Sequence, residues 1–318
     1  MFLPASFTLG ESMKDGNDMK KQRNFKKFLY SNNTAGYVFS LPFIVGFLGF
    51  TLIPILVSMY YSVTDYKLGQ EANFIGLQNY LDLFADERFM NSMKVTVIYV
   101  LISVPVKLAF ALLVAYFLTK QRRGVTFYRS LYYVPSLIGG SVAVALVWKT
   151  IFSRRGLANA ILAGLGLDKI SWLGDPKTAM GILIAMSAWQ FGSSMIIFAA
   201  GLKEIPTTYY EAADIDGANK LQRFVKITLP CLSPIILYNL VMQTISAFMS
   251  FTQAFVITQG GPNDSTNFYA LYVYNHAFKW SNMGYASAMS WIMLIIISAL
   301  TLIIFKTSKF WVFSESDS

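Results

Sequence analysis

Five polar side chains recur at regular intervals within an otherwise apolar stretch of the sequence. They are Asn239, Gln243, Ser246, Ser250 and Gln253, separated by gaps of 4, 3, 4 and 3 residues. Gaps of this size place all five on one face of a helix. Amides and hydroxyls both donate and accept hydrogen bonds, so this polar stripe suits the hydroxyl groups of a sugar, and the rings of Trp189 and Trp291 offer apolar stacking surfaces. Polar side chains also hold membrane helices together and tryptophan marks membrane interfaces, so both interpretations stay open.

Residues suited to catalysis or metal binding are scarce in this chain. It has one histidine, His276, and one cysteine, Cys231, far apart in the sequence. A disulfide within the chain needs two cysteines, and an active site needs a nucleophile, an acid–base pair or a metal cluster. The chain also lacks the Gly-x-x-x-x-Gly-Lys-Ser/Thr loop that binds nucleotide phosphates. We therefore expect that the chain is not an enzyme and binds no cofactor or metal itself.

The composition indicates a protein of the membrane. Hydrophobic residues make up 55% of the 318 residues and charged residues only 14%, whereas a soluble domain carries about 25% charged residues. The net charge of +9 comes from residues that cluster between apolar runs. This distribution favours a role in membrane orientation over nucleic-acid binding.

Six stretches are long and apolar enough to cross the roughly 30 Å hydrocarbon layer as helices, which takes about 20 residues. We place them at Tyr37–Val63, Met93–Leu118, Leu131–Phe152, Ala179–Leu202, Leu232–Ile257 and Gly284–Phe305. The sequence therefore predicts an all-α polytopic membrane protein. Residues 1–36 form a basic cytoplasmic N-tail, residues 37–306 the transmembrane domain and residues 307–318 a cytoplasmic C-tail.

The loop charges predict that both termini are cytoplasmic. With the N-terminus inside, sixteen Lys and Arg residues lie in the inner tails and loops and seven in the outer loops. The outer pair Arg154–Arg155 runs against this trend and remains without an explanation.

Three lysines fall within or at the ends of the predicted spans. Lys94 and Lys149 are close enough to an interface to extend into water, but Lys107 lies near the middle of the second span. A charge at that depth is a functional candidate, although the ammonium could instead reach water or a backbone carbonyl. The six spans hold no carboxylate, which counts against the alternative of a proton-coupled secondary transporter for a small polar solute.

The loop over residues 203–230 reads as two short helices at the membrane surface. Pro206, followed by two threonines, is a helix-start signal for a helix over Tyr209–Asp216. Gly217 supplies the backbone freedom for a turn. A second helix follows over Ala218–Thr228, and Pro230 ends the unit before the fifth span.

This loop resembles the EAA loop of binding-protein-dependent ABC importer permeases. The match consists of Glu211, Ala212, Ala213, Gly217, Ile227, Leu229 and Pro230 at the family's spacing. The resemblance implies a type I importer permease with a coupling loop, residues 203–230, that sits in a cleft of an ATPase subunit. It also implies a second homologous permease, two ATPase subunits that bind ATP and Mg²⁺, an extracytoplasmic solute-binding protein, and a place in the bacterial cytoplasmic (inner) membrane.

Looser matches over residues 127–290 resemble the carbohydrate branch of that family, in the form of the maltose-type first permease. They include the segments 127–135, 146–152, 156–162, 172–176, 257–262 and 283–288. The resemblance implies a carbohydrate as the transported substrate, and it does not identify the sugar.

Overall fold

The computed structural model describes residues 32–119 and 124–313, and within these residues every regular element is a helix. Two isolated β-bridges join Thr64 to Phe74 and Lys67 to Asn282. The chain divides into two compact units, residues 1–60 and 61–318. The all-α prediction is confirmed, and the predicted basic tail lies outside the described residues as far as residue 31.

The described part of the first unit is an apolar helix with a π-helical turn inside it. α2 (Asn32–Phe47) leads through η1 (Leu48–Leu52) into α3 (Ile53–Ser62). Residues 39–62 are long and apolar enough to cross a membrane, close to the predicted span 37–63. Pro54, which has no N–H to donate, follows η1 closely. A local π turn is one way in which a helix re-pairs its backbone near a proline.

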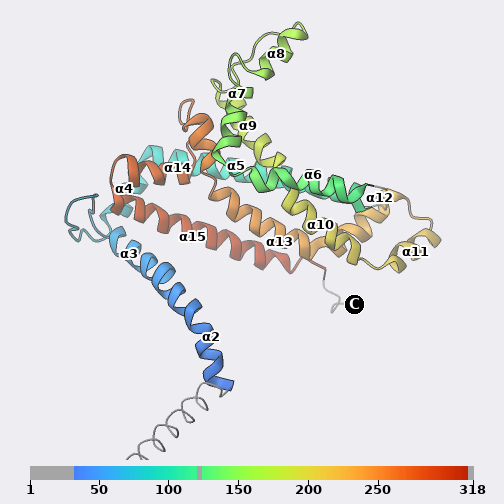
Figure 1. Cartoon of the computed structure of the whole chain (residues 1–318), viewed down its shortest axis with the longest axis horizontal. Helices are drawn as coiled ribbons and strands as arrows, with labels where there is room; N and C mark the ends of the chain where they lie inside the picture. The colour runs from blue at the N-terminus through green and yellow to red at the C-terminus, as the bar shows by residue number, and fades with distance from the viewer. Residues whose placement is uncertain (1–31, 120–123, 314–318) are drawn as a thin grey trace, which may run out of the picture. The chain divides into compact units, whose positions relative to one another are not determined.

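Three long helices frame the second unit (Figure 1): α5 (Glu87–Thr119), α13 (Leu229–Phe248) and α15 (Met283–Ser308). α12 (Lys220–Arg223) and η2 (Phe224–Thr228) run directly into α13, so one helix of 29 residues extends from Lys220 to Phe248. α5 packs against α13 and against two helices that lie between them in the sequence, α9 (Pro176–Trp189) and α10 (Gly192–Glu204). α5 therefore lies at the centre of this unit's packing.

The third and fourth predicted spans are each a bent pair of helices. α6 (Val125–Ile138) and α7 (Val142–Ile151) meet at 99°, and α9 and α10 meet at 44°. The described residues thus hold four helices of membrane-spanning length, or up to six if each bent pair counts as one span. Neither predicted span, Leu131–Phe152 or Ala179–Leu202, is therefore a single straight helix. Gly139 and Gly140 interrupt the helix, and Ser141 starts the next one by accepting a 3.3 Å hydrogen bond from the Val144 N–H.

The two bends pack against each other, which satisfies the backbone groups that they free. The Ser136 hydroxyl donates to the Gln190 carbonyl at 3.1 Å and accepts from the Ser193 N–H at 3.0 Å. The Gln190 amide donates to the Gly139 carbonyl at 3.1 Å. A Cβ at Gly192 would collide with the backbone of Tyr132, so glycine is what allows this approach.

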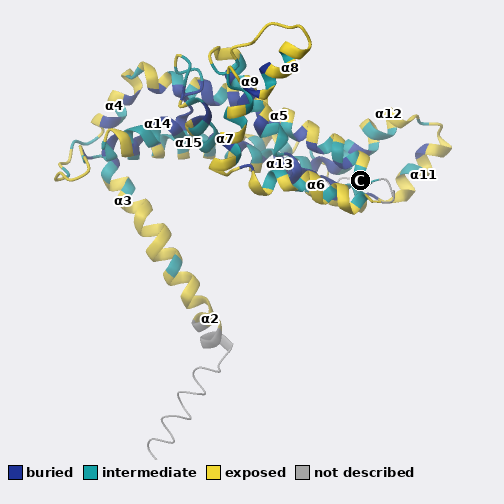
Figure 2. Cartoon of the chain, turned by 45° about the horizontal axis from the view of Figure 1, so that its top comes forward, coloured by how far each residue is buried: buried dark blue, intermediate teal, exposed yellow. Residues whose placement is uncertain are grey.

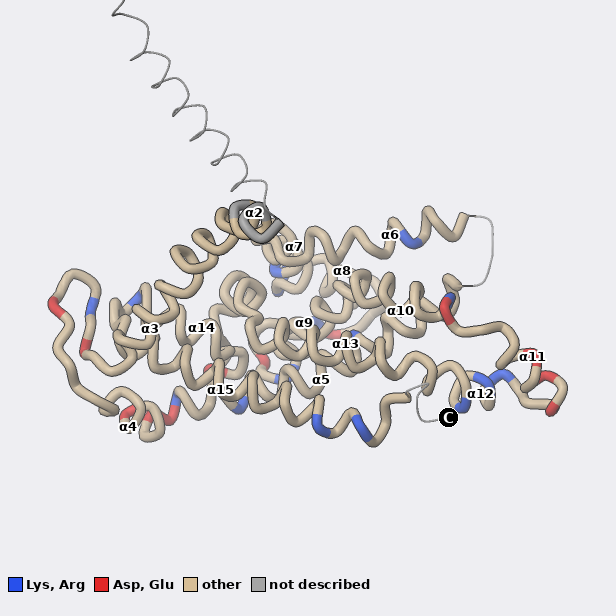
Figure 3. The backbone as a smooth tube through the Cα atoms, turned by 90° about the horizontal axis from the view of Figure 1, so that it is seen from below, with Lys and Arg blue, Asp and Glu red and all other residues tan. Residues whose placement is uncertain are grey.

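The shorter elements of the second unit gather mainly at its two ends (Figure 1). α4 (Gln78–Ala85), α14 (Tyr269–Tyr274) and η4 (Asn275–Lys279) lie near the start of α5. α11 (Thr207–Ile215) and α12 lie at the opposite end, and charged residues gather at both ends (Figure 3). α8 (Leu157–Gly164) follows α7, and η3 (Ala254–Thr258) follows α13.

The buried core lies where α5 meets α9, α10 and the segment after η3, whereas α11 and α12 are largely exposed (Figure 2). Tyr99, Phe198 and Phe268 are at most 1% exposed, and the rings of Tyr99 and Phe268 lie 4.5 Å apart. This packing fixes the helices that carry the polar residues described next.

Candidate functional site

The first half of the loop over residues 203–230 ends in a glycine turn. α11 begins after Pro206 and ends at Ile215. Gly217 then has φ +72°, a conformation that other residues adopt only with strain. The Ala218 N–H donates to the Ala213 carbonyl at 2.9 Å and the Gly217 N–H to the Asp214 carbonyl at 3.2 Å, which is the Schellman pattern of a helix end. The predicted turn at Gly217 is confirmed.

The second half of the loop begins two residues later than predicted and does not end at Pro230. Asn219 and Gln222 cap α12 reciprocally, each side chain accepting from the other's backbone N–H at 2.9 and 2.8 Å. From Lys220 the helix continues through η2 and past Pro230 into α13. The prediction that Pro230 closes the unit was wrong. Proline is tolerated in the first turn of a helix, and the π-helical η2 directly precedes it.

Contacts across the turn hold the two halves of the loop together. The Arg223 guanidinium pairs with the Asp214 carboxylate. The Tyr210 hydroxyl hydrogen-bonds the Thr228 hydroxyl at 2.9 Å. Ala213, one turn after Tyr210 on α11, is buried. These contacts make α11, the turn and the start of the long helix one ordered unit.

The outer surface of this unit is unusually apolar for a charged loop. Ile215 is 88% exposed and Leu221 is 71% exposed, and Glu211 and Ala212 beside them are exposed as well. Within the described residues the Glu211 carboxylate has no hydrogen bond or ion pair. Ile227, Leu229 and Pro230 are half-buried where the loop joins α13. The loop thus presents exposed apolar side chains and an unpaired carboxylate that another protein could cover.

A polar cavity of about 50 Å³ lies between α5, α9 and α13. Its first residue on α13, Gln243, follows Pro230 at the end of the loop by 13 residues. Four of the five residues of the predicted polar stripe line it: Gln243, Ser246, Ser250 and Gln253. The fifth, Asn239, is buried and donates to the Ile235 carbonyl of its own helix at 3.1 Å. A cavity of this size holds only a few water molecules, so this chain alone supplies a polar wall and not a chamber for a solute.

The stripe does not lie on one continuous helix as predicted. α13 ends at Phe248, Ser250 lies in the break over residues 249–251, and Gln253 lies in the helical turn that leads into η3. They reach the same cavity because the chain turns back toward α5. The Ser250 hydroxyl donates to the Gln253 amide oxygen at 3.0 Å, and the Tyr99 hydroxyl donates to the same oxygen at 3.4 Å. The Gln243 amide donates to the Ser194 hydroxyl at 3.1 Å.

The two predicted tryptophans lie outside the lining of this cavity. The ring of Trp189 packs 6.0 Å from the ring of Trp148, although its neighbour Gln190 reaches the cavity. Trp291 is half-buried on α15. Their proposed role as stacking surfaces stays a prediction.

Comparison with known proteins places the chain in a family. Residues 84–308 match the model of the family described as binding-protein-dependent transport system inner membrane component. The chain belongs to this family of ABC importer permeases. A probable ABC transporter permease protein, YesP of Bacillus subtilis, is 53% identical over 302 residues, which cover 94% of this chain and 96% of that one. The arabinooligosaccharides transport system permease AraP of the same organism is 32% identical, covering 91% and 93%.

The fold is also that of a solved permease. A bacterial ABC transporter involved in the import of the acidic polysaccharide alginate matches with a TM-score of 0.77 and 23% identity, over 90% of this chain and 98% of that one. Family membership confirms the predicted permease, membrane location and dependence on a separate ATPase, and it decides against a secondary transporter.

Sequence reasoning missed several of the permease's cavity residues. Tyr99, Ser187 and Gln190 come from α5 and α9, and only tertiary packing brings them to the stripe. Lys107 of α5 also lines the cavity. Its position as a lone charge near the middle of the second predicted span had already made it a functional candidate.

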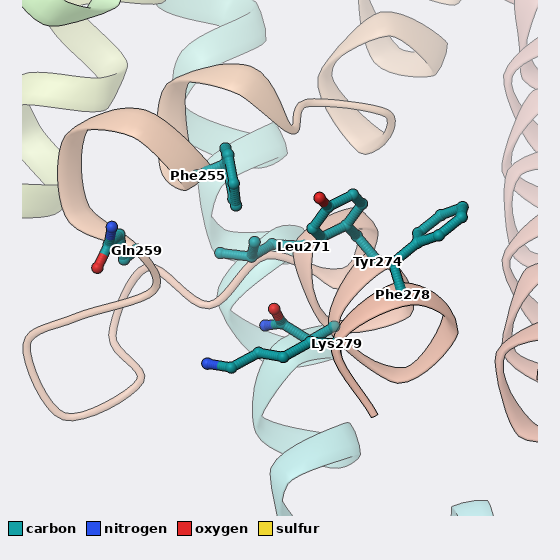
Figure 4. Close-up of a pocket in the computed structure, with 7 residues that line it drawn as sticks. Phe255, Gln259, Leu271, Tyr274, Phe278 and Lys279 are labelled. Carbon is teal, nitrogen blue, oxygen red and sulfur yellow. The ribbon is translucent and has the colours of Figure 1, made fainter. Parts of the chain in front are cut away.

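The permease has a second, larger hollow of about 370 Å³ at the end opposite the loop. It opens between η3 and the α14–η4 segment (Figure 4). The rings of Phe255 and Tyr274 lie 5.3 Å apart above Leu271, and the side chain of Lys279 extends below them. It shares no lining residue with the polar cavity, so the two are separate features.

A buried polar cluster orders that same end of the permease. The Asp86 carboxylate accepts from the hydroxyls of Tyr272 at 2.6 Å and Tyr285 at 3.1 Å. Burial raises the pKa of Asp86, but these hydrogen bonds and those from nearby backbone N–H groups outweigh it and hold the pKa below its usual value. Burial lowers the pKa of the adjacent His276 to about 4, so this imidazole is neutral at neutral pH.

Proposed function

We propose that this permease forms one half of the translocation path for a carbohydrate, and that a second, homologous permease forms the other half. Two ATPase subunits drive it through the coupling loop, residues 203–230, and an extracytoplasmic binding protein delivers the substrate. Carbohydrate as the class is supported by the polar cavity and by relatives named for oligosaccharide and alginate import. The small cavity volume supports a second wall contributed by another subunit.

One observation carries the proposal: a single helix joins the coupling loop to the polar cavity. The helix begins at Lys220 within the loop and reaches Gln243 and Ser246 of the cavity without interruption. At 1.5 Å per residue Lys220 and Gln243 lie roughly 35 Å apart along the helix. A movement imposed on the loop is therefore transmitted to the cavity by a rigid element, as alternating access requires.

The coupling residues fit an ATPase cleft. Ile215 and Leu221 offer apolar surface, and Glu211 offers an unpaired carboxylate for a cation of the ATPase. Ala212 and Ala213 keep the helix narrow, Gly217 makes the turn, and Ile227, Leu229 and Pro230 anchor the loop to α13.

We also propose that both termini and the coupling loop face the cytoplasm, with the protein in the bacterial cytoplasmic membrane. The loop charges and the basic residues of α12 and η2 support this orientation. Impermeant cysteine reagents applied from outside should label a single cysteine at Asp168 and leave one at Asp216 unlabelled, in a background in which Cys231 is replaced.

Uptake by the reconstituted transporter tests the function. Proteoliposomes with the permease, its second permease and the ATPase should accumulate a labelled oligosaccharide only when ATP and the binding protein are supplied. Accumulation driven by a proton gradient without ATP would contradict the proposal.

A further inference from the structure

Lys107 is a cation near the middle of α5, the longest helix among the described residues. It follows Glu87, the first residue of α5, by 20 residues and precedes Thr119, the last, by 12. At 1.5 Å per residue its Cα lies roughly 30 Å and 18 Å from the two helix ends. An extended lysine side chain spans about 6 Å, so the ammonium does not reach either end of α5.

No group of the described residues neutralises this charge. Lys107 makes no hydrogen bond or ion pair in residues 32–119 and 124–313. Among the helices around the cavity, α9 and α13 carry no carboxylate. The only carboxylates of α5 and α10 are Glu87, at the start of α5, and Glu204, at the end of α10. In contrast, the Lys149 ammonium donates to the Val256 carbonyl at 3.1 Å, and Lys94 is exposed.

The charge points into a site that is otherwise neutral. Lys107 lines the polar cavity, and the other side chains that line it are amides, hydroxyls and apolar groups. Among these, the Ser246 hydroxyl is exposed and makes no hydrogen bond within the described residues. Such a set can bind the hydroxyls of a sugar, and it contains one fixed positive charge that a neutral sugar leaves unpaired.

We propose that the carbohydrate moved by this permease carries an anionic group, a carboxylate or a phosphate, and that the Lys107 ammonium pairs with that group in the polar cavity. The inference rests on the proposed function and adds the charge of its substrate. A desolvated cation favours an anionic ligand over a neutral one because only the anion compensates the charge. A carboxylate from the second permease is the rival source of compensation.

Uptake into proteoliposomes with the complete transporter and its binding protein separates these cases. The probes are two matched pairs: a trisaccharide of uronic acids with its carboxyl-reduced form, and trehalose 6-phosphate with trehalose. Each is tested with the wild type, Lys107→Gln, Lys107→Arg and the control Lys94→Gln, which removes an exposed lysine from the same helix. ATP hydrolysis stimulated by the binding protein reports whether each complex is assembled.

The wild type should import at least one anionic probe and prefer it to its neutral form. Lys107→Gln should lower uptake of that anion by about 10- to 100-fold, the loss typical of a hydrogen bond to a charged group. It should leave binding-protein-stimulated hydrolysis intact. Lys107→Arg keeps the positive charge and should lose less uptake of the anion than Lys107→Gln. Lys94→Gln should keep uptake within about twofold of the wild type.

Three results would overturn the inference. If the wild type imports only the neutral probes, the proposed function stands, but the inference that the substrate is anionic is wrong. A Lys107→Gln complex that imports the anion normally excludes the pairing. A Lys107→Gln complex that loses assembly, or all probes equally, assigns the lysine to the contact with the second permease. A wild type that imports neither these probes nor any other labelled oligosaccharide with ATP and the binding protein contradicts the proposed function itself.

Discussion

The coupling loop and the polar cavity occupy the two ends of one helix, and they are built in opposite ways. The loop is made from consecutive residues: a helix, a glycine turn, a capping box and the start of α13, held by contacts within residues 210–228. The cavity is assembled from α5, α9, α13 and the break after α13. A locally built element can keep its shape while it moves as a unit, whereas an assembled cavity changes when its helices shift.

The first prediction would break the assignment of the loop as the ATPase contact. Glu211→Ala removes an exposed, unpaired carboxylate, and losing one member of a charged pair at an interface typically costs about 2–5 kcal/mol. We expect the variant to reach the membrane and to lose the ATPase on co-purification. Asp168→Ala, at an exposed position after α8, is the control and should retain it.

The second prediction concerns the shape of the loop. Gly217→Val forces a β-branched residue into φ +72°, at a cost of about 1–3 kcal/mol. Uptake should fall about tenfold or more while the rest of the permease stays folded. Gly217→Asn should retain most activity, because asparagine tolerates this conformation better. Equal activity of the valine and asparagine variants would show that the turn does not matter.

The third prediction concerns the cavity. Ser246→Ala removes a hydroxyl that has no partner within the described residues, so its loss should be felt only by substrate. We expect uptake at limiting substrate to fall by about fivefold, the equivalent of roughly 1 kcal/mol, with basal ATP hydrolysis unchanged.

Gln243→Ala should lower uptake as well, but it also breaks the hydrogen bond to the Ser194 hydroxyl. Ser290→Ala on α15, whose hydroxyl bonds its own helix, is the control. Normal uptake by Ser246→Ala would make the stripe a contact between helices.

The sequence predicted the loop better than the cavity, because the loop is built from consecutive residues and the cavity from distant segments. The turn at Gly217 was predictable because glycine and its spacing act locally. The capping box at Asn219 and Gln222 was also readable but was missed, and it moved the helix start from 218 to 220. The break after Phe248 and the arrival of Tyr99, Ser187 and Gln190 depend on packing between distant segments, which no local pattern records.

The bends in the third and fourth spans lie between these cases. Gly139–Gly140 marks an interruption in the sequence, but its angle of 99° is set by the contact with the bend at Gln190. Hydropathy finds apolar segments of the right length and does not distinguish a straight helix from a bent pair.

The smallest expected effect concerns the end opposite the loop. The folded-state pKa of His276 is about 4, below the ordinary 6.5, so the unfolded chain binds the extra proton between those values. Stability should therefore be fully present above pH 6.5 and fall as the pH is lowered toward 4. Asp86, whose pKa is lowered from 3.8, stays charged in this window. The melting temperature of wild type should drop by about 2–4 °C more than that of His276→Phe between pH 7 and pH 5. Parallel curves for the two proteins would contradict the burial of a neutral imidazole.

The central claim is that the helix from Lys220 to Phe248 carries movement from the coupling loop to the cavity. The most direct test is the number of substrate molecules imported per ATP hydrolysed by a variant with Tyr238→Gly and Met242→Gly. Both side chains are exposed, and neither lines the cavity. They lie on the helix between the end of the loop and Gln243, and each glycine weakens the helix by about 1 kcal/mol.

Leu302→Gly with Phe305→Gly, at exposed positions of α15, is the matched control. We predict that the ratio falls several-fold in the α13 variant and not in the control, with the ATPase still bound. An unchanged ratio in an assembled α13 variant would contradict the account.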